Sequence, residues 1–156
     1  MGYNVADIIN KAVKIAIRRR TIYENIGQEK CDNLPVKIIS KVLLKEVDRT
    51  IEYYEEFLKE INNDVEFEEI DFSIYDKMSF LINDFNRRID TAEINNVKEY
   101  LLFSLGFEKS VYSLLINIQG RFVINANDIQ TKTYKILAAI IDNKARLIAM
   151  LDKALQ

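Results

Sequence analysis

The sequence predicts an all-α fold: four long helices packed as a bundle, in two antiparallel hairpins joined by a long crossover that contains a short extra helix. Apolar residues recur at three- and four-residue steps over four long stretches. Only a few residues separate the first two stretches, whereas a long segment without a clean period separates the second from the third. At 156 residues, of which 49% are hydrophobic, the chain fits a single domain, 1–156, with a sizeable core.

The first predicted hairpin consists of two long helices. Asn4, followed three residues later by Asp7, forms a capping signal, and the apolar period that follows predicts a helix from Val5 to about Glu29. Pro35 is acceptable in the first turn of the next helix, where its missing N–H is not needed. That helix runs to about Asn62, and so short a turn makes the two helices antiparallel.

The crossover is predicted between residues 63 and 90. It begins with an acidic, aromatic segment and continues into a shorter helix expected from Lys77 to Ile89. The whole stretch is long enough to run the length of a bundle.

The second predicted hairpin begins with a capping pair, Asp90 and Glu93, and its first helix ends at Gly120, which takes positive φ freely. Asn127 or Asp128 is expected to cap the last helix. Hairpin, long crossover and hairpin are the connectivity of a ferritin-like four-helix bundle.

Each helix of the second hairpin carries one charged residue in its apolar seam. Glu108 interrupts the seam of the third long helix, and Lys144 interrupts that of the fourth. A buried carboxylate has to be paired, protonated, hydrogen-bonded or bound to metal. The sequence therefore predicts a polar site at Glu108.

Composition excludes several classes of function. The chain has 0 histidines, so it has no Ser/His/Asp or Cys/His site and no His-ligated zinc. A formal charge of −2 provides no basic field for nucleic acid. The single cysteine, Cys31, forms no internal disulfide, and without a signal-peptide pattern we expect a cytoplasmic protein. We also expect no membrane span, because Glu108 and Lys109 interrupt the most apolar run.

Two phrases carry a resemblance to a known family: LLKEVDRTIEYYEEFL at residues 43–58 and ILAAIIDNKARLIAMLDK at residues 136–153. The first and third long helices also resemble each other, as in a duplicated hairpin. With these features the chain resembles the rubrerythrin branch of the ferritin-like superfamily over nearly its whole length. In that family two helices each supply a glutamate and two each supply a Glu-x-x-His pair, which together hold two irons. The resemblance alone implies a di-iron oxidoreductase.

Most of the implied ligand positions carry other residues. Glu108 is kept, but the other five positions are occupied by Ala16, Val47, Thr50, Lys144 and Leu147. The paired CxxC motifs of full rubrerythrins are also absent. We therefore expect no cofactor and no catalytic residue. The alternative is iron or manganese on a non-standard carboxylate set, Glu24, Glu46 and Glu108.

The family register places Lys144 where iron would lie, so the sequence predicts a core ion pair between Glu108 and Lys144. Two further residues are candidate core polar groups. Arg19 continues the seam of the first helix, and it either reaches outward or bonds a core carboxylate. Tyr23 matches a family tyrosine near the metals and is expected to be a core aromatic residue whose hydroxyl finds a partner.

Three functional classes remain open. The first is a metal-free, non-catalytic protein of unknown specific function that acts through self-association, as a homodimer, or through a protein partner. The second is a rubrerythrin-like oxidoreductase or iron-handling protein with the non-standard carboxylate site. The third binds a small molecule in the vacated core, where Ala16, Val47 and Thr50 leave room. The homodimer is expected because six apolar residues lie off the seams: Ile17, Leu44, Leu102, Phe103, Leu114 and Ile148.

Overall fold

The computed structural model describes residues 2–64, 67–89 and 93–156, and it is all-helical. The α-helices are α1 (Val5–Glu29), α2 (Leu34–Asn62), α3 (Phe72–Arg87), α4 (Val97–Arg121) and α5 (Lys132–Ala154), with a short 3-10 helix, η1 (Ala126–Gln130), before α5. In the described ranges the only β pairing is an isolated antiparallel bridge between Tyr3 and Ile70. The predicted all-α class is therefore confirmed.

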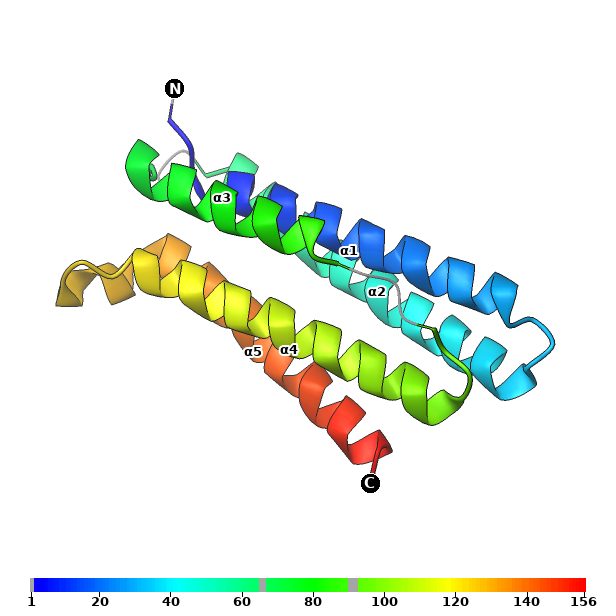
Figure 1. Cartoon of the computed structure of the whole chain (residues 1–156). Coiled ribbons are helices and arrows are strands. Elements are labelled where there is room, and N and C mark those ends of the chain that lie inside the picture. The colour runs from blue at the N-terminus through cyan, green and yellow to red at the C-terminus, as the bar shows by residue number, and fades with distance from the viewer. Residues whose placement is uncertain (1, 65–66, 90–92) are drawn as a thin grey trace.

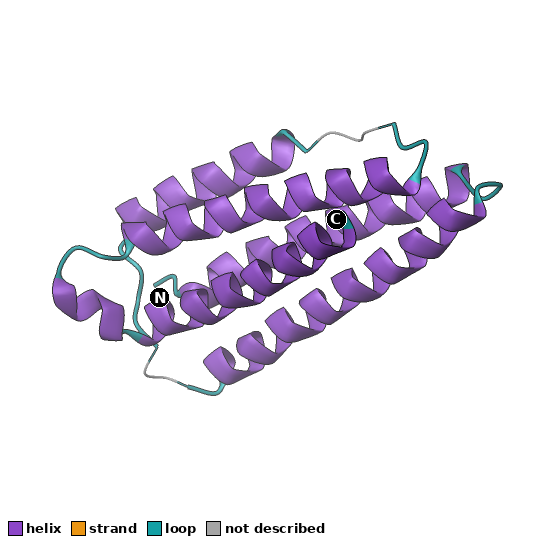
Figure 2. Cartoon of the chain, turned by 90° about the horizontal axis from the view of Figure 1, so that it is seen from below, coloured by secondary structure: helices purple, strands orange, loops and turns teal. Residues whose placement is uncertain are grey.

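The long helices form two antiparallel hairpins that lie along one another (Figure 1). α1 packs on α2, and α4 packs on α5. Between the hairpins the chain returns along α3, which contacts both α1 and α4, so α4 runs in the same direction as α2. The view from below shows the helices roughly aligned with one long axis (Figure 2).

The first hairpin has the predicted bounds because its capping signals are strong. The Asn4 side chain accepts a hydrogen bond from the Ala6 N–H at 2.8 Å, and the Asn4 N–H donates to the Asp7 carboxylate at 2.9 Å. In α2 the Asn33 side chain accepts from the Val36 N–H, and Pro35 lies in the first turn.

The extra helix begins five residues earlier than the expected Lys77. Asp71 caps it by accepting hydrogen bonds from the N–H and hydroxyl of Ser73, at 2.9 and 2.5 Å. This local capping is sufficient to start α3 at Phe72, and the helix ends at Arg87 rather than Ile89.

The expected caps of the second hairpin are wrong or untested. Asp90 lies outside the described residues, and Glu93 is in the loop before α4. Asn96 caps α4 instead, because its side chain accepts a hydrogen bond from the Glu99 N–H at 2.8 Å. The helix passes the expected end at Gly120 by one residue.

The cap of α5 is also different from the prediction. Asn127 and Asp128 belong to η1, which has its own capping box, and Thr131 caps α5 through the Tyr134 N–H at 3.1 Å. A carboxylate from the segment before α3, that of Glu68, also caps the N-terminal end of α5. Glu68 accepts hydrogen bonds from the N–H groups of Lys132 and Thr133, at 2.6 and 3.2 Å.

Within the described ranges, α4 is the one helix long and apolar enough, by length and composition, to cross a membrane, and 33% of its most apolar window is buried. This corrects the expectation that Glu108 and Lys109 make the segment too polar. A core helix of a bundle has the same length and composition, so this property alone does not indicate a membrane.

The six off-seam apolar residues divide into two groups. Ile17 and Leu102 are about half exposed, whereas the other four pack, partly buried, against the core: Leu44, Phe103, Leu114 and Ile148. Only two of the six are therefore free surface groups in this structure.

Buried apolar residues form two clusters along the bundle, and the charged seam residues lie where the clusters meet. Ile140 and Val111 belong to the first cluster, and Leu147 and Leu105 belong to the second. Lys144 lies between the two α5 residues, and Glu108 lies between the two α4 residues. The candidate site is therefore a polar layer in the middle of the core.

Candidate functional site

The centre of the site is an ion pair between α4 and α5. The Lys144 Nζ atom donates a hydrogen bond to Glu108 Oε2 at 2.8 Å. Both side chains are almost fully enclosed, with 4% and 1% of their surfaces exposed. The structure thus brings together the two charged residues that interrupt the seams of the second hairpin.

A second cation, Arg19 of α1, binds the same carboxylate. Its Nη1 atom contacts Glu108 Oε1, and the residue is 2% exposed. The guanidinium carbon lies 5.8 Å from the ring centroids of both Tyr23 and Phe107, so two aromatic faces enclose it. Of the two arrangements considered for Arg19, the structure shows the bond to a core carboxylate.

The cluster carries an excess of positive charge, because two cations share one carboxylate. Among the described residues, Arg19, Glu108 and Lys144 are the only charged side chains that are buried. Burial, with a smaller contribution from the charge of Arg19, lowers the pKa of Lys144 to about 8. Burial also lowers the pKa of Arg19.

Tyr23 belongs to a neighbouring layer of hydroxyl groups. Its hydroxyl donates a hydrogen bond to Ser104 Oγ at 3.0 Å, and its ring packs edge-on against Tyr100 at 5.7 Å between centroids. The Tyr100 and Ser40 hydroxyls are 2.6 Å apart, and burial raises the pKa of Tyr100 to about 12. Ser40 could have been found from the sequence, because it continues the buried face of α2 between Val36 and Leu43.

The residues at the family ligand positions do not fit a di-iron centre. Ala16, Val47 and Leu147 are buried without any donor atom in their side chains. The Thr50 hydroxyl is used locally, because it donates to the Glu46 carbonyl at 3.0 Å. At the remaining changed position the Lys144 ammonium bonds Glu108, where a metal would need an anionic or neutral donor.

The alternative carboxylate set does not converge either. Glu24 pairs with Arg20 on its own helix, and Glu46 pairs with Arg49 at 3.3 Å. In the described part of the chain, no group of three or more His, Cys, Asp or Glu side chains could hold a metal ion.

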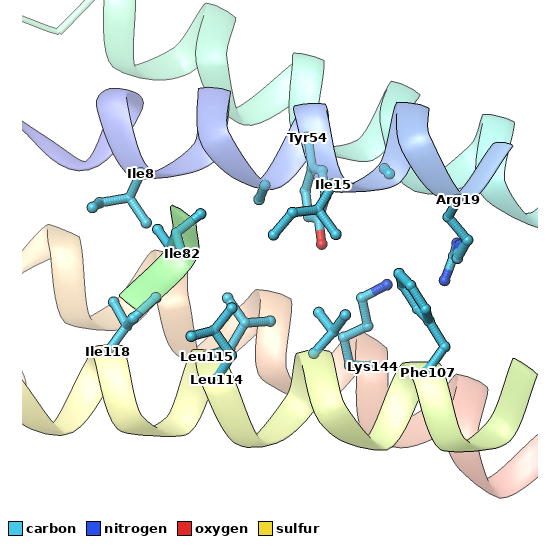
Figure 3. Close-up of a pocket in the computed structure, with 13 residues that line it drawn as sticks. Ile8, Ile15, Arg19, Tyr54, Ile82, Phe107, Leu114, Leu115, Ile118 and Lys144 are labelled. Carbon is cyan, nitrogen blue, oxygen red and sulfur yellow. The ribbon is translucent and has the colours of Figure 1, made fainter. Parts of the chain in front are cut away.

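A small cavity adjoins the ion cluster on the side away from Glu108. Arg19, Lys144 and Tyr54 line one end of it, and the remaining wall is apolar (Figure 3). Its volume is ≈ 20 Å³. Of the three small residues expected to leave room in the core, only Ala16 lines this cavity.

Comparisons with known proteins give no relative from which a role could be taken. No protein-family model matches the chain, and no curated protein and no solved structure matches it at a significant level.

Proposed function

We propose that this chain is a metal-free, non-catalytic helical bundle of the ferritin-like type whose working form is a homodimer. The observation that supports self-association best is the division of charge along the exposed face of α2. Lysines predominate in the first half of that face, and glutamates predominate in the second half, which also carries Arg49 and Lys59.

The ferritin-like assignment is supported by the connectivity of the helices. α3 returns along the bundle between two hairpins, and α2 and α4 run in the same direction (Figure 1). The resemblance of the α2 and α5 sequences to the rubrerythrin branch points to the same family.

The metal-free and non-catalytic character of the protein is supported by the contacts of the Glu108 carboxylate. Its two oxygens are each held by a cation, so neither is available to a metal or to a substrate proton. The carboxylates that could replace the lost ligands form ion pairs of their own. The centre of the bundle is therefore a structural ion cluster.

The first half of the α2 face combines aliphatic and cationic side chains. Leu34, Ile38 and Val42 are 63%, 51% and 57% exposed and lie one turn apart. Three exposed lysines occupy the same face without an ion pair to any described residue: Lys37, Lys41 and Lys45.

The second half of the face is complementary to the first. Glu52, Glu55 and Glu56 are exposed and form no ion pair with any residue in the described ranges. If two copies of α2 pair antiparallel about a two-fold axis, residues near the two ends of the face lie opposite each other. Lys41 of one copy then faces Glu52 of the other, and Lys37 faces Glu55. Each contact occurs twice.

Charge reversal tests this pairing without touching the core. We would compare wild type with two double variants, Lys37→Glu with Lys41→Glu, and Glu52→Lys with Glu55→Lys, by sedimentation velocity. Each variant alone places like charges opposite each other and should sediment as an 18.2 kDa monomer. An equimolar mixture should form a heterodimer, because every contact is then oppositely charged. A wild-type monomer, or variants that dimerise as wild type does, would contradict the proposal.

A further inference from the structure

A groove runs along the outside of the bundle between α3 and α4. The two helices lie side by side and antiparallel (Figure 1). Two hollows follow each other along this pair of helices. The larger, of ≈ 780 Å³, lies between the end of α3 and the first part of α4, and the smaller, of ≈ 470 Å³, lies between the first part of α3 and the end of α4. Among the described residues none from α2 lines either hollow, so a dimer paired through α2 leaves the groove free.

The floor of the groove is apolar and aromatic. Phe85 and Phe107 pack edge-on across it, at 6.0 Å between ring centroids. Two large apolar side chains of the lining remain in contact with solvent, since Leu102 is 49% exposed and Phe80 is 64% exposed. The groove is open above Gly106, because a Cβ atom at this position would meet no other side chain within 4 Å. The groove therefore presents apolar surface that a partner can cover.

The rim of the groove is positively charged. Four cations line the two hollows: Lys77, Arg88, Lys109 and Arg121. Among the lining residues that the structure describes, only Asp76 carries a carboxylate. Arg88 already pairs with Asp84 at 3.1 Å, whereas the other three cations form no ion pair with any residue in the described ranges. This is a local excess of positive charge on a chain with a formal charge of −2, so an acidic partner complements the rim.

The shape of the groove fits a helix. α3 has 16 residues, so the groove beside it is about 24 Å long, which a helix of about 16 residues spans. A helix laid between two others directs about one apolar residue per turn to the floor. Both hollows open to solvent, whereas a small-molecule site encloses most of its ligand. The described part of the chain also offers no sheet edge to which an extended peptide could add.

We propose that the groove between α3 and α4 docks an amphipathic helix of an acidic partner protein. The apolar face of that helix covers Phe80 and Leu102. Carboxylates on its flanks pair with the three free cations: Lys77, Lys109 and Arg121. This binding goes beyond the homodimer and does not depend on it, because each protomer carries a complete groove.

Synthetic peptides test the chemistry of the groove. The probe is a fluorescein-labelled, alanine-based peptide of about 16 residues, with one leucine per turn and glutamates on both flanks of the leucine stripe. Its fluorescence anisotropy should rise and saturate as the protein is added. The same peptide with lysine in place of glutamate should bind about tenfold more weakly, because it meets like charges on the rim. The glutamate peptide with serine in place of leucine should also lose about tenfold in affinity, because it covers no apolar surface.

Charge variants test whether the peptide lies at the rim. Lys77→Glu combined with Lys109→Glu should weaken binding of the acidic peptide about tenfold and should strengthen binding of the lysine peptide by about the same factor. Lys14→Glu combined with Lys135→Glu is the matched control, because it changes the net charge equally at exposed positions outside the groove. This control should bind the acidic peptide as wild type does.

A steric variant tests whether the peptide lies on the floor. Gly106→Leu fills the open space on α4, and the fold should be kept because leucine favours a helix more than glycine does. Circular dichroism checks the fold, and affinity for the acidic peptide should fall about tenfold. Ala145→Leu, at an exposed position of α5, is the matched control and should bind as wild type does.

Four results would overturn the proposal. The first is no binding of the acidic peptide to wild type at protein concentrations up to about 1 mM. The second is equally tight binding of the lysine peptide, which would mean that the rim does not select an acidic helix. The third is wild-type affinity in either groove variant, which would place the peptide elsewhere. The fourth is a Gly106→Leu protein that sediments as a monomer while wild type sediments as a dimer, because a second copy of the chain would then occupy the groove.

Discussion

Arg19 and Lys144 approach one carboxylate from opposite hairpins of the bundle. Arg19 belongs to α1 and contacts Glu108 Oε1, whereas Lys144 belongs to α5 and bonds Oε2 at 2.8 Å. The cluster thus connects the first hairpin to the second through a single acidic side chain. The three residues should contribute unequally to stability, because Glu108 takes part in both ion pairs whereas each cation takes part in one.

Removal of Glu108 should therefore destabilise the protein more than removal of Lys144. Glu108→Gln leaves two buried cations without an anion and should lower the free energy of unfolding by about 3–5 kcal/mol. Lys144→Met leaves the Arg19 contact in place and should cost at most about 1 kcal/mol. Urea denaturation of both single variants and the double variant gives the coupling energy, expected at about 0.5–3 kcal/mol. Equal costs for the single variants, or strictly additive ones, would mean that Glu108 is not shared in this way.

Stability should rise with pH over the range in which Lys144 titrates. Burial lowers the pKa of Lys144 to about 8 in the folded protein, from an ordinary value of 10.5. Between these values the unfolded chain binds more protons than the folded chain, so the free energy of unfolding increases with pH. Lys144→Met should lack this increase, and Lys109→Met, which removes an exposed lysine of α4, should retain it. Denaturant unfolding at several pH values measures the slope, and equal slopes in all three proteins would contradict the assignment.

Tyr100 should act in the opposite direction at higher pH. Burial raises its pKa to about 12 from 10.0, so the folded protein keeps a proton that the unfolded chain loses. Stability should therefore fall with pH above this ordinary value. Tyr100→Phe should reduce the fall, at a cost of about 1 kcal/mol near neutral pH for the lost contact with Ser40. Tyr112→Phe, half-buried on the same helix, is the matched control and should change neither property.

The start of α4 can be tested through its cap. Asn96→Ala removes the acceptor of the Glu99 N–H and should cost about 1 kcal/mol. Glu93→Ala changes a residue that the sequence pattern favoured as part of the cap, but it lies in the loop and should cost less than about 0.5 kcal/mol. Thermal unfolding of the two variants compares the two candidate caps. A larger loss of stability for Glu93→Ala than for Asn96→Ala would mean that the helix begins at the cap expected from the sequence.

The approximate bounds that the sequence predicts for the first hairpin agree with the structure, because capping and periodicity point to the same residues there. The first helix starts with the capping pair Asn4 and Asp7, which fits only a helix N-terminus. The second helix has Pro35, which fits only its first turn. The second hairpin offers several Asx residues near each start, and only the folded chain shows which one faces a free N–H. Asp71 was missed because the acidic segment before it has no period to mark a helix.

Part of the candidate site is also predictable from the sequence, namely the residues whose place is decided by the pattern within one helix. Seam position identifies Glu108 and Lys144 as inward-facing charges. Arg19 lies on a seam too, but its long side chain can leave the core, so its contact is decided by the surrounding packing. The cavity beside Tyr54 depends on how side chains from several helices fill space together, and no pattern within one helix records that.

The bridge between Tyr3 and Ile70 has a practical consequence. The Ile70 N–H donates to the Tyr3 carbonyl at 2.7 Å, and the Tyr3 ring stacks on Tyr75 of α3 at 3.8 Å between centroids. Through these two contacts, the segment before α1 holds α3 in place. α3 carries Ile82, which lines the cavity. A purification tag at the amino end would disturb these contacts, whereas one at the carboxyl end would leave them intact. Tagging at the carboxyl end is therefore the better design for stability measurements in which the native packing of α3 has to be kept.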